Sequence, residues 1–95
     1  MTSPQNINQY IYVASHPLGF IKIGRSWSPR GRIICLRSSY PGTVLAWQSE
    51  IFFPPGMADK VEMISHRLMA DFHVAGEWFE SPVNVGIHAV TVAQE

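Results

Sequence analysis

A tyrosine and a lysine with the potential for acid–base chemistry lie on two neighbouring apolar strands near the N-terminus. If residues 15–19 form a five-residue hairpin loop, Tyr12 of the first strand faces Lys22 of the second. A free phenol has a pKa of about 10, and an adjacent ammonium group would lower it, so this pair is a candidate proton acceptor. Lys22 could instead bind an anion or act as the base itself, and a Tyr–Lys pair on a solvated sheet also stabilises by packing alone.

The alternation of the two strands places their side chains on two faces. One face is entirely apolar and consists of Ile11, Val13, Ile21 and Ile23. The other face carries Tyr10, Tyr12, Phe20 and Lys22. We therefore expect the first face to pack into the core and the second to form an active surface.

The elements that must position this surface follow along the chain. Ser28 and Pro29 are typical of a helix start and predict a helix over 29–39. Residues 43–53 are rich in β-branched and aromatic types and predict a third strand.

Helical spacing then predicts the longest helix over 57–73. Its expected core stripe is Met57, Val61, Ile64, Leu68 and Phe72. After an extended piece, 77–80, Ser81 and Pro82 indicate a last helix. The predicted fold is α+β, a small, mainly antiparallel three-stranded sheet flanked by helices.

The composition limits the classes of protein to consider. The 95 residues are 46% hydrophobic, which predicts one domain spanning 1–95. No apolar run is long enough for a membrane span and Met1–Gln9 is polar, so we expect a soluble, unprocessed protein. Cys35 is the only cysteine, which excludes an internal disulfide, fits a reducing cytoplasm and predicts a small buried apolar residue.

The charge is balanced overall but uneven along the chain. Seven basic and seven acidic residues give a net charge of zero, without the basic excess of a typical nucleic-acid binder. Segment 22–37 nevertheless contains five basic residues and no acidic one, which predicts a local surface for a polyanion. The candidate nucleic-acid contacts are Arg25, Trp27, Arg30 and Arg37.

Several short motifs together resemble the GIY-YIG nuclease superfamily, most closely its phage-type branch. They are Tyr10-Ile11-Tyr12, Lys22-Ile23-Gly24-Arg25, Arg32 ten positions after Lys22, Glu62 with His66, and Gly76-Glu77-Trp78-Phe79. These elements cover most of the chain, in the family's order. The sequence departs from the pattern at three positions: Tyr10 replaces a glycine, Lys22 replaces a tyrosine, and Leu36 stands where many members carry a histidine.

The resemblance implies a metal-dependent endonuclease that hydrolyses phosphodiester bonds in DNA, one strand per site. The implied catalytic residues are Tyr12, Lys22, Arg32 and Glu62, with Tyr10 and His66 in secondary positions. Glu62 would bind Mg²⁺ or Mn²⁺, and Arg32 would donate two hydrogen bonds to the phosphate. Double-strand cleavage would require a homodimer or rebinding, and we expect either a weak sequence preference or a partner protein that supplies specificity.

Other interpretations of the same residues stay open. The fold could serve as a nucleic-acid-binding or protein-interaction module without cleavage, for example a phage-encoded inhibitor. Arg32 could pair with Glu50 or Glu62, while Glu62 and His66 could form a surface pair or a transition-metal site. Trp78 and Phe79 could close the core edge beside a solvated Glu77, or Trp78 could stack on a base.

Overall fold

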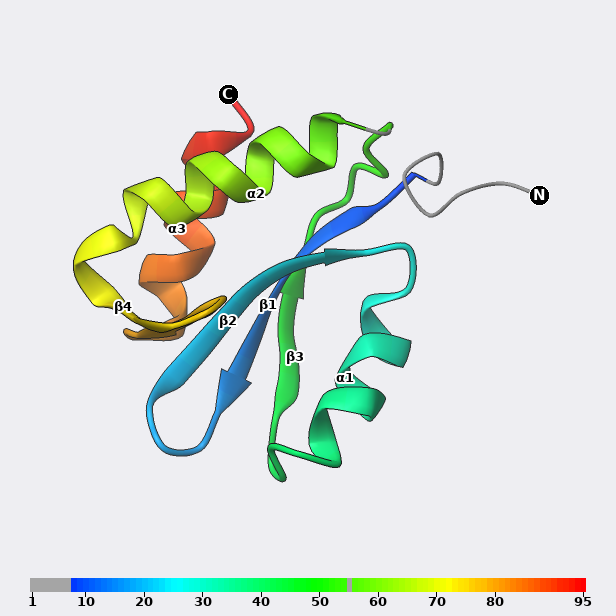
Figure 1. Cartoon of the computed structure of the whole chain (residues 1–95). Coiled ribbons are helices and arrows are strands. Elements are labelled where there is room, and N and C mark those ends of the chain that lie inside the picture. The colour runs from blue at the N-terminus through cyan, green and yellow to red at the C-terminus, as the bar shows by residue number, and fades with distance from the viewer. Residues whose placement is uncertain (1–7, 55) are drawn as a thin grey trace.

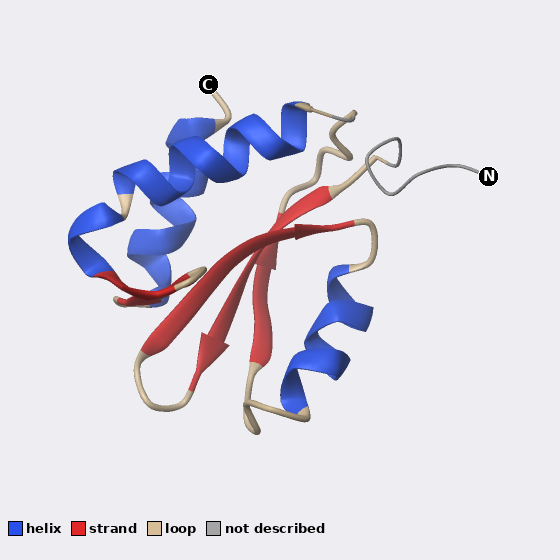
Figure 2. Ribbon diagram, in the orientation of Figure 1, coloured by secondary structure: helices blue, strands red, loops and turns tan. Residues whose placement is uncertain are grey.

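The computed structural model describes residues 8–54 and 56–95, and these form one antiparallel sheet of five strands with three α-helices (Figures 1 and 2). The elements are β1 (Tyr10–His16), β2 (Phe20–Ser26), α1 (Pro29–Arg37), β3 (Val44–Gln48), α2 (Met57–Leu68), η2 (Ala70–Phe72), β4 (His73–Ala75), β5 (Trp78–Glu80) and α3 (Val83–Ala93). The strand order is β3-β1-β2-β5-β4. Most of the polar segment Met1–Gln9 lies outside the described residues.

The α+β class is confirmed, and the predicted number of strands is wrong. The additional strands β4 and β5 have three residues each, too short to produce a readable alternation. Gly76 joins them with a positive φ of 55°, a conformation that glycine adopts without steric cost. The predicted third strand is shorter than expected, although an isolated bridge between Gln9 and Phe53 extends the pairing.

The β1–β2 hairpin has a shorter loop than predicted, which moves the register by two residues. The Gly19 N–H donates to the His16 carbonyl at 3.0 Å, and Gly19 takes a φ of 92°, so only residues 17–19 lie between the strands. Tyr12 therefore faces Gly24, and Lys22 faces Ala14. The predicted pairing of Tyr12 with Lys22 is wrong, but a shift of two residues leaves every side chain on its predicted face.

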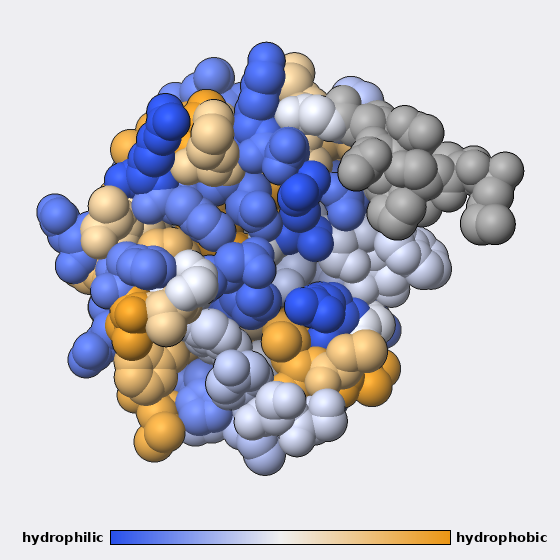
Figure 3. Space-filling view, in the orientation of Figure 1, coloured by the Kyte–Doolittle hydropathy of each residue, from blue (hydrophilic) through white to orange (hydrophobic). Residues whose placement is uncertain are grey.

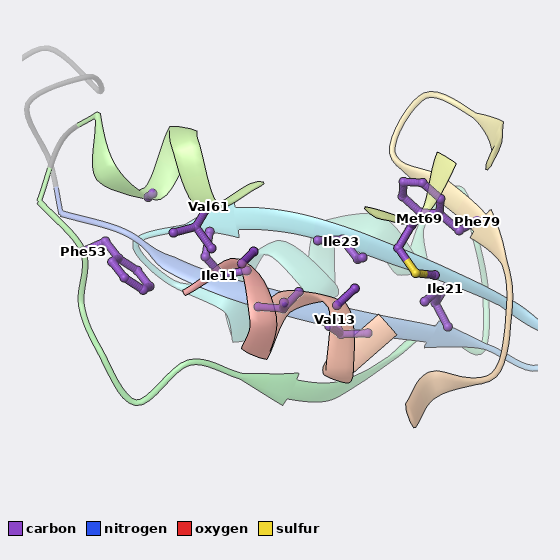
Figure 4. Close-up of a cluster of buried hydrophobic side chains, with 12 residues drawn as sticks. Ile11, Val13, Ile21, Ile23, Phe53, Val61, Met69 and Phe79 are labelled. Atoms are coloured by element: carbon purple, nitrogen blue, oxygen red, sulfur yellow. The ribbon is translucent and has the colours of Figure 1, made fainter. Parts of the chain in front are cut away.

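The apolar face of the hairpin forms the main core, as predicted, and helices α2 and α3 cover it (Figures 1 and 4). The buried residues of this cluster are Ile11, Val13, Ile21, Ile23, Phe53, Ala58, Val61, Met69, Phe79, Ala89, Val90 and Ala93. Gly86 allows α3 to approach the sheet closely, because a Cβ there would lie 2.3 Å from Cδ1 of Ile21. The predicted last helix is confirmed as α3.

Helix α2 ends earlier and faces the core differently than predicted. It stops at Leu68, and its buried residues are Ala58, Val61 and Ser65, followed by Met69. Most of the predicted stripe is exposed: Met57, Ile64, Leu68 and Phe72. Small side chains bring this helix close to the sheet, and the Ser65 hydroxyl donates to the Val61 carbonyl at 2.7 Å.

Helix α1 lies over the other face of the sheet. Ser28 caps it by accepting a hydrogen bond from the Gly31 N–H, and Pro29 occupies the first turn, as predicted. Ile33 and Leu36 are buried against Tyr12 and Ala14. Cys35 falls on the outer side of this helix and is exposed, so the prediction of a buried thiol is wrong.

Among the described residues, none of the helices has the length and apolar character needed to cross a membrane.

Candidate functional site

A polar cavity of about 470 Å³ opens where β1 begins and β2 ends, beside α1 and α2. Its lining comes from β1, β2, the following loop, both helices and the turn before β5, namely Gln9, Tyr12, Arg25, Ser26, Trp27, Arg32, Glu62 and Glu77. Hydrophilic residues gather on the surface between α1 and α2 (Figure 3). Three of the four predicted catalytic residues line this cavity, and Lys22 is not among them.

Gly24 allows Tyr12 to reach the cavity. The tyrosine ring lies across Gly24 on the neighbouring strand, and a Cβ at Gly24 would lie 2.6 Å from the Tyr12 hydroxyl oxygen. A side chain at this position would therefore displace the ring. The glycine in the Lys22-Ile23-Gly24 motif has a steric explanation.

The free edge of β2 allows α2 to contribute to the cavity. Strand β5 pairs with β2 only from Phe20 to Lys22, and the Ile23 N–H still donates to the Glu77 carbonyl at 3.2 Å. The Ile23 carbonyl lies 2.8 Å from Nε2 of His66, so this imidazole satisfies an edge carbonyl. One turn earlier on α2, Glu62 is held beside the same strand.

Two carboxylates and the imidazole converge at this edge. One potential ligand atom from each of Glu62, His66 and Glu77 lies within 4.8 Å of the others. Burial, followed by the negative charge of Glu77, raises the pKa of Glu62 from 4.5 to about 7, and Arg25 only partly offsets these effects. Carboxylates this close together need a shared proton or a cation, and their oxygen atoms are ligands that Mg²⁺ and Mn²⁺ prefer.

Two of the cations at or beside the cavity, Lys22 and Arg25, already have acidic partners. Nζ of Lys22 lies 3.0 Å from Glu77, and the lysine side chain is only 7% exposed. Arg25 lies 3.0 Å from Asp59 and 3.6 Å from Glu62. These pairs neutralise two of the five basic residues in segment 22–37.

Tyr12 does not have the lowered pKa that was predicted. Burial is the main cause that raises its pKa from 10.0 to about 12, and the Glu77 and Glu62 charges raise it further. The neighbouring Arg32 guanidinium acts in the opposite direction but is outweighed. Because Lys22 faces Ala14 and pairs with Glu77, it does not activate the phenol.

Arg32 is the basic residue at the cavity with no ion pair in the described part of the chain. Its predicted alternative partners, Glu50 and Glu62, are not within ion-pair distance. The Arg32 side chain is thus available to an anionic group in the cavity.

Of the remaining predicted residues, Trp27 lines the polar cavity, whereas Arg30, Arg37 and Tyr10 do not. Trp27 lines the cavity and is 65% exposed. Arg30 and Arg37 line a different cavity between α1 and β3, and Arg37 Nε donates to the Thr43 carbonyl at 2.8 Å. Tyr10 packs on Phe52, with ring centroids 4.6 Å apart, and does not line the site.

Glu77 is the site residue that the sequence reasoning missed, since it was expected to be solvated. One signal was available: a lysine on a covered sheet face needs an acidic partner.

The alternation in 77–80 means that Trp78 and Phe79 cannot both lie on the core face of the sheet. Phe79 is 1% exposed in the core, while Trp78 lies half-buried on the opposite face, so the prediction that both close the core edge holds for Phe79 only.

The chain matches no protein-family model, no curated protein and no solved structure. Its function is therefore inferred from the geometry and chemistry of the cavity.

Proposed function

We propose that this chain is a metal-dependent phosphodiester hydrolase of the GIY-YIG type that cuts DNA, one strand per site. The observation that carries the proposal is the convergence of Tyr12, Arg32 and Glu62 in one polar cavity. These residues come from β1, α1 and α2, and no local pattern brings them together. Phosphodiester hydrolysis needs an activated water molecule and positive charge at the phosphate, to which a metal-binding carboxylate, a guanidinium and a hydroxyl group can contribute.

Glu62 and Glu77 are the residues that would hold Mg²⁺ or Mn²⁺. Their carboxylates share a half-buried position, and the raised pKa of Glu62, about 7, reflects burial followed by the negative charge of Glu77. When bound, a divalent ion supplies positive charge to the phosphate and lowers the pKa of a water molecule. His66 supports this pair from the strand edge, where its Nε2 is bonded to the Ile23 carbonyl.

Arg32 and Tyr12 would act together on the phosphate. The guanidinium has two parallel donors that match phosphate oxygens. Tyr12 stays protonated at neutral pH, because its pKa is about 12, so it donates a hydrogen bond. Lys22 is a positioning residue in this proposal, since its ammonium group fixes Glu77 at 3.0 Å.

The proposal also covers the oligomeric state, the partners and the cellular compartment. A single cavity makes one cut, so double-strand cleavage would use a homodimer or a partner protein, which would also supply specificity. The exposed thiol of Cys35 fits a reducing compartment, and we propose the cytoplasm.

A second candidate is a nucleic-acid-binding or protein-interaction module of the same fold that does not cleave. The specific observation in its favour is the protonated state of Tyr12, which leaves the site without a phenolate base. Leu36, at the position where many GIY-YIG members carry a histidine, is buried in the packing under α1 and supplies no base either.

A cleavage assay separates these two candidates. Labelled single-stranded and double-stranded DNA would be incubated with Mg²⁺, Mn²⁺ or EDTA, using wild type, Glu62→Gln and Glu77→Gln. We expect metal-dependent products from the wild type, a loss of about 100-fold or more for Glu62→Gln, and about 10- to 100-fold for Glu77→Gln.

The matched control is Glu80→Gln, which removes an exposed carboxylate of β5 outside the cavity and should cleave like the wild type. Circular dichroism would check folding, particularly for Glu77→Gln, because this change leaves the buried Lys22 without its acidic partner. A folded wild type without products on any substrate would contradict the nuclease proposal and favour the binding module.

A further inference from the structure

A second, apolar cavity lies on the same face of the sheet as the polar one. We call it the aromatic cleft; its volume is about 280 Å³, and it is lined by His16, Leu18, Phe20, Tyr40, Val74, Ala75 and Trp78. Leu18 and Val74 are 76% and 52% exposed at its rim. The hydrophobic patch over β4 and the β1–β2 loop in Figure 3 includes this region.

Aromatic rings form the walls of the cleft. Trp78 lies beside Tyr40, with ring centroids 5.0 Å apart, and edge-on to His16 at 6.4 Å. Because Phe79 takes the core side of β5, Trp78 must face away from the core. Its ring is only half-buried, so part of its surface stays open to the cleft.

The cleft and the polar cavity are neighbours along the hairpin. Lys22 lies between them, with Nζ 5.8 Å from the Trp78 ring centroid and 3.0 Å from Glu77 of the polar cavity. Phe20 at the cleft and Gly24 under Tyr12 are four residues apart on β2, a separation of about 13 Å along the strand. Stacked nucleotides rise about 3.4 Å each, so this distance spans about four stacked nucleotides, or about two where an unstacked strand extends to roughly twice that rise.

We propose that the aromatic cleft holds an unstacked nucleobase of the DNA strand whose phosphate lies in the polar cavity. The proposal rests on the proposed function, and it names the substrate as single-stranded or locally unpaired DNA. Three features favour a base as the occupant: the walls are aromatic rings, the volume suits one small ring system, and Lys22 contacts both Trp78 of the cleft and Glu77 of the polar cavity. A base in a duplex would have to leave its stack to enter.

An abasic scan tests this proposal directly. A set of single-stranded oligonucleotides would each lack one base while keeping every phosphate, and their binding would be measured by fluorescence anisotropy in EDTA, which prevents metal-dependent cleavage. The cut site mapped with Mg²⁺ gives the position of the phosphate. We expect one abasic position, about two to four nucleotides from the cut, to weaken wild-type binding about 10-fold.

The Tyr40→Leu variant removes one wall of the cleft at a residue that is 44% exposed, so folding should be retained. It should bind intact DNA about 10-fold more weakly and lose its sensitivity to that abasic position, and Tyr40→Phe should restore both. The matched control is Phe52→Leu, which changes a ring of similar exposure, 42%, outside both cavities and should keep the wild-type scan.

The outcomes separate this inference from the nuclease proposal. A flat scan in a wild type that cleaves DNA would overturn the aromatic cleft as a base site and leave the nuclease proposal standing. A scan whose sensitive position persists in Tyr40→Leu would also overturn it, because the base would then stack elsewhere. Absence of DNA binding and cleavage altogether would reject the proposed function, and the base site with it.

Discussion

The two faces of the β1–β2 hairpin are built by different physical rules. On the core face, Ile11, Val13, Ile21 and Ile23 pack against α2 and α3 and need only shape and volume to match. On the opposite face, Tyr12 and Lys22 are also almost fully buried, at 1% and 5% exposure, but each polar group needs a partner.

The partners on the second face come from elements distant in sequence. Glu77 neutralises Lys22, Arg32 lies with Tyr12 at the polar cavity, and His66 satisfies the Ile23 carbonyl at the strand edge. Within the described residues, no buried side-chain nitrogen or oxygen lacks a hydrogen-bond partner. The candidate site thus consists of buried polar groups with specific partners rather than a solvated surface.

The largest expected effect on stability comes from the core face. Ile23→Ala should lower the free energy of unfolding by about 2–5 kcal/mol, because it leaves a cavity under a fully buried side chain. Urea denaturation measures this change. The control Ile34→Ala removes a side chain that is 67% exposed and should cost less than about 0.5 kcal/mol. Equal losses in the two variants would contradict the assignment of the core face.

A smaller effect on stability is expected at Gly24, which leaves room for the Tyr12 ring on the polar face of the hairpin. Gly24→Ala places a methyl group against the Tyr12 ring, so we expect a loss of about 1–3 kcal/mol in stability and reduced cleavage. A double-mutant cycle with Tyr12→Leu, measured by urea denaturation, checks the cause. The cost of Gly24→Ala should shrink once the ring is gone. An unchanged cost would place the strain elsewhere on β2.

The smallest expected effect is on the pH dependence of stability. Folding raises the pKa of Glu62 from 4.5 to about 7, so between these values the folded protein binds more protons than the unfolded chain. The free energy of unfolding should therefore decrease as the pH rises through this window, and Glu62→Gln should lose that decrease.

Urea denaturation in EDTA at about pH 5 and about pH 8 compares the two proteins, with Glu80→Gln as a control that should follow the wild type. Identical pH dependence in wild type and Glu62→Gln would show that the carboxylate is not held in a buried, negatively charged setting. Together with the core variant, this measurement distinguishes a face stabilised by packing from one governed by charge.

The sequence by itself determined the local features of this fold. Alternation assigned the side chains of β1 and β2 to their faces, because a strand has a period of two whatever its partner. Ser28 and Pro29 marked the start of α1, and helical spacing identified α2 and α3, because caps and periodicity act within a few residues.

Only the tertiary structure decided the register of the hairpin, the buried side of α2 and the composition of the cavity. The register depended on a loop closed by one hydrogen bond to Gly19, and the orientation of α2 depended on how closely Ala58 and Ser65 let it approach the sheet. Glu77 reaches the cavity because β5 begins beside Lys22, and 55 residues of chain separate Glu77 from this lysine. Such contacts depend on the packing of distant elements, which no local pattern of residues encodes.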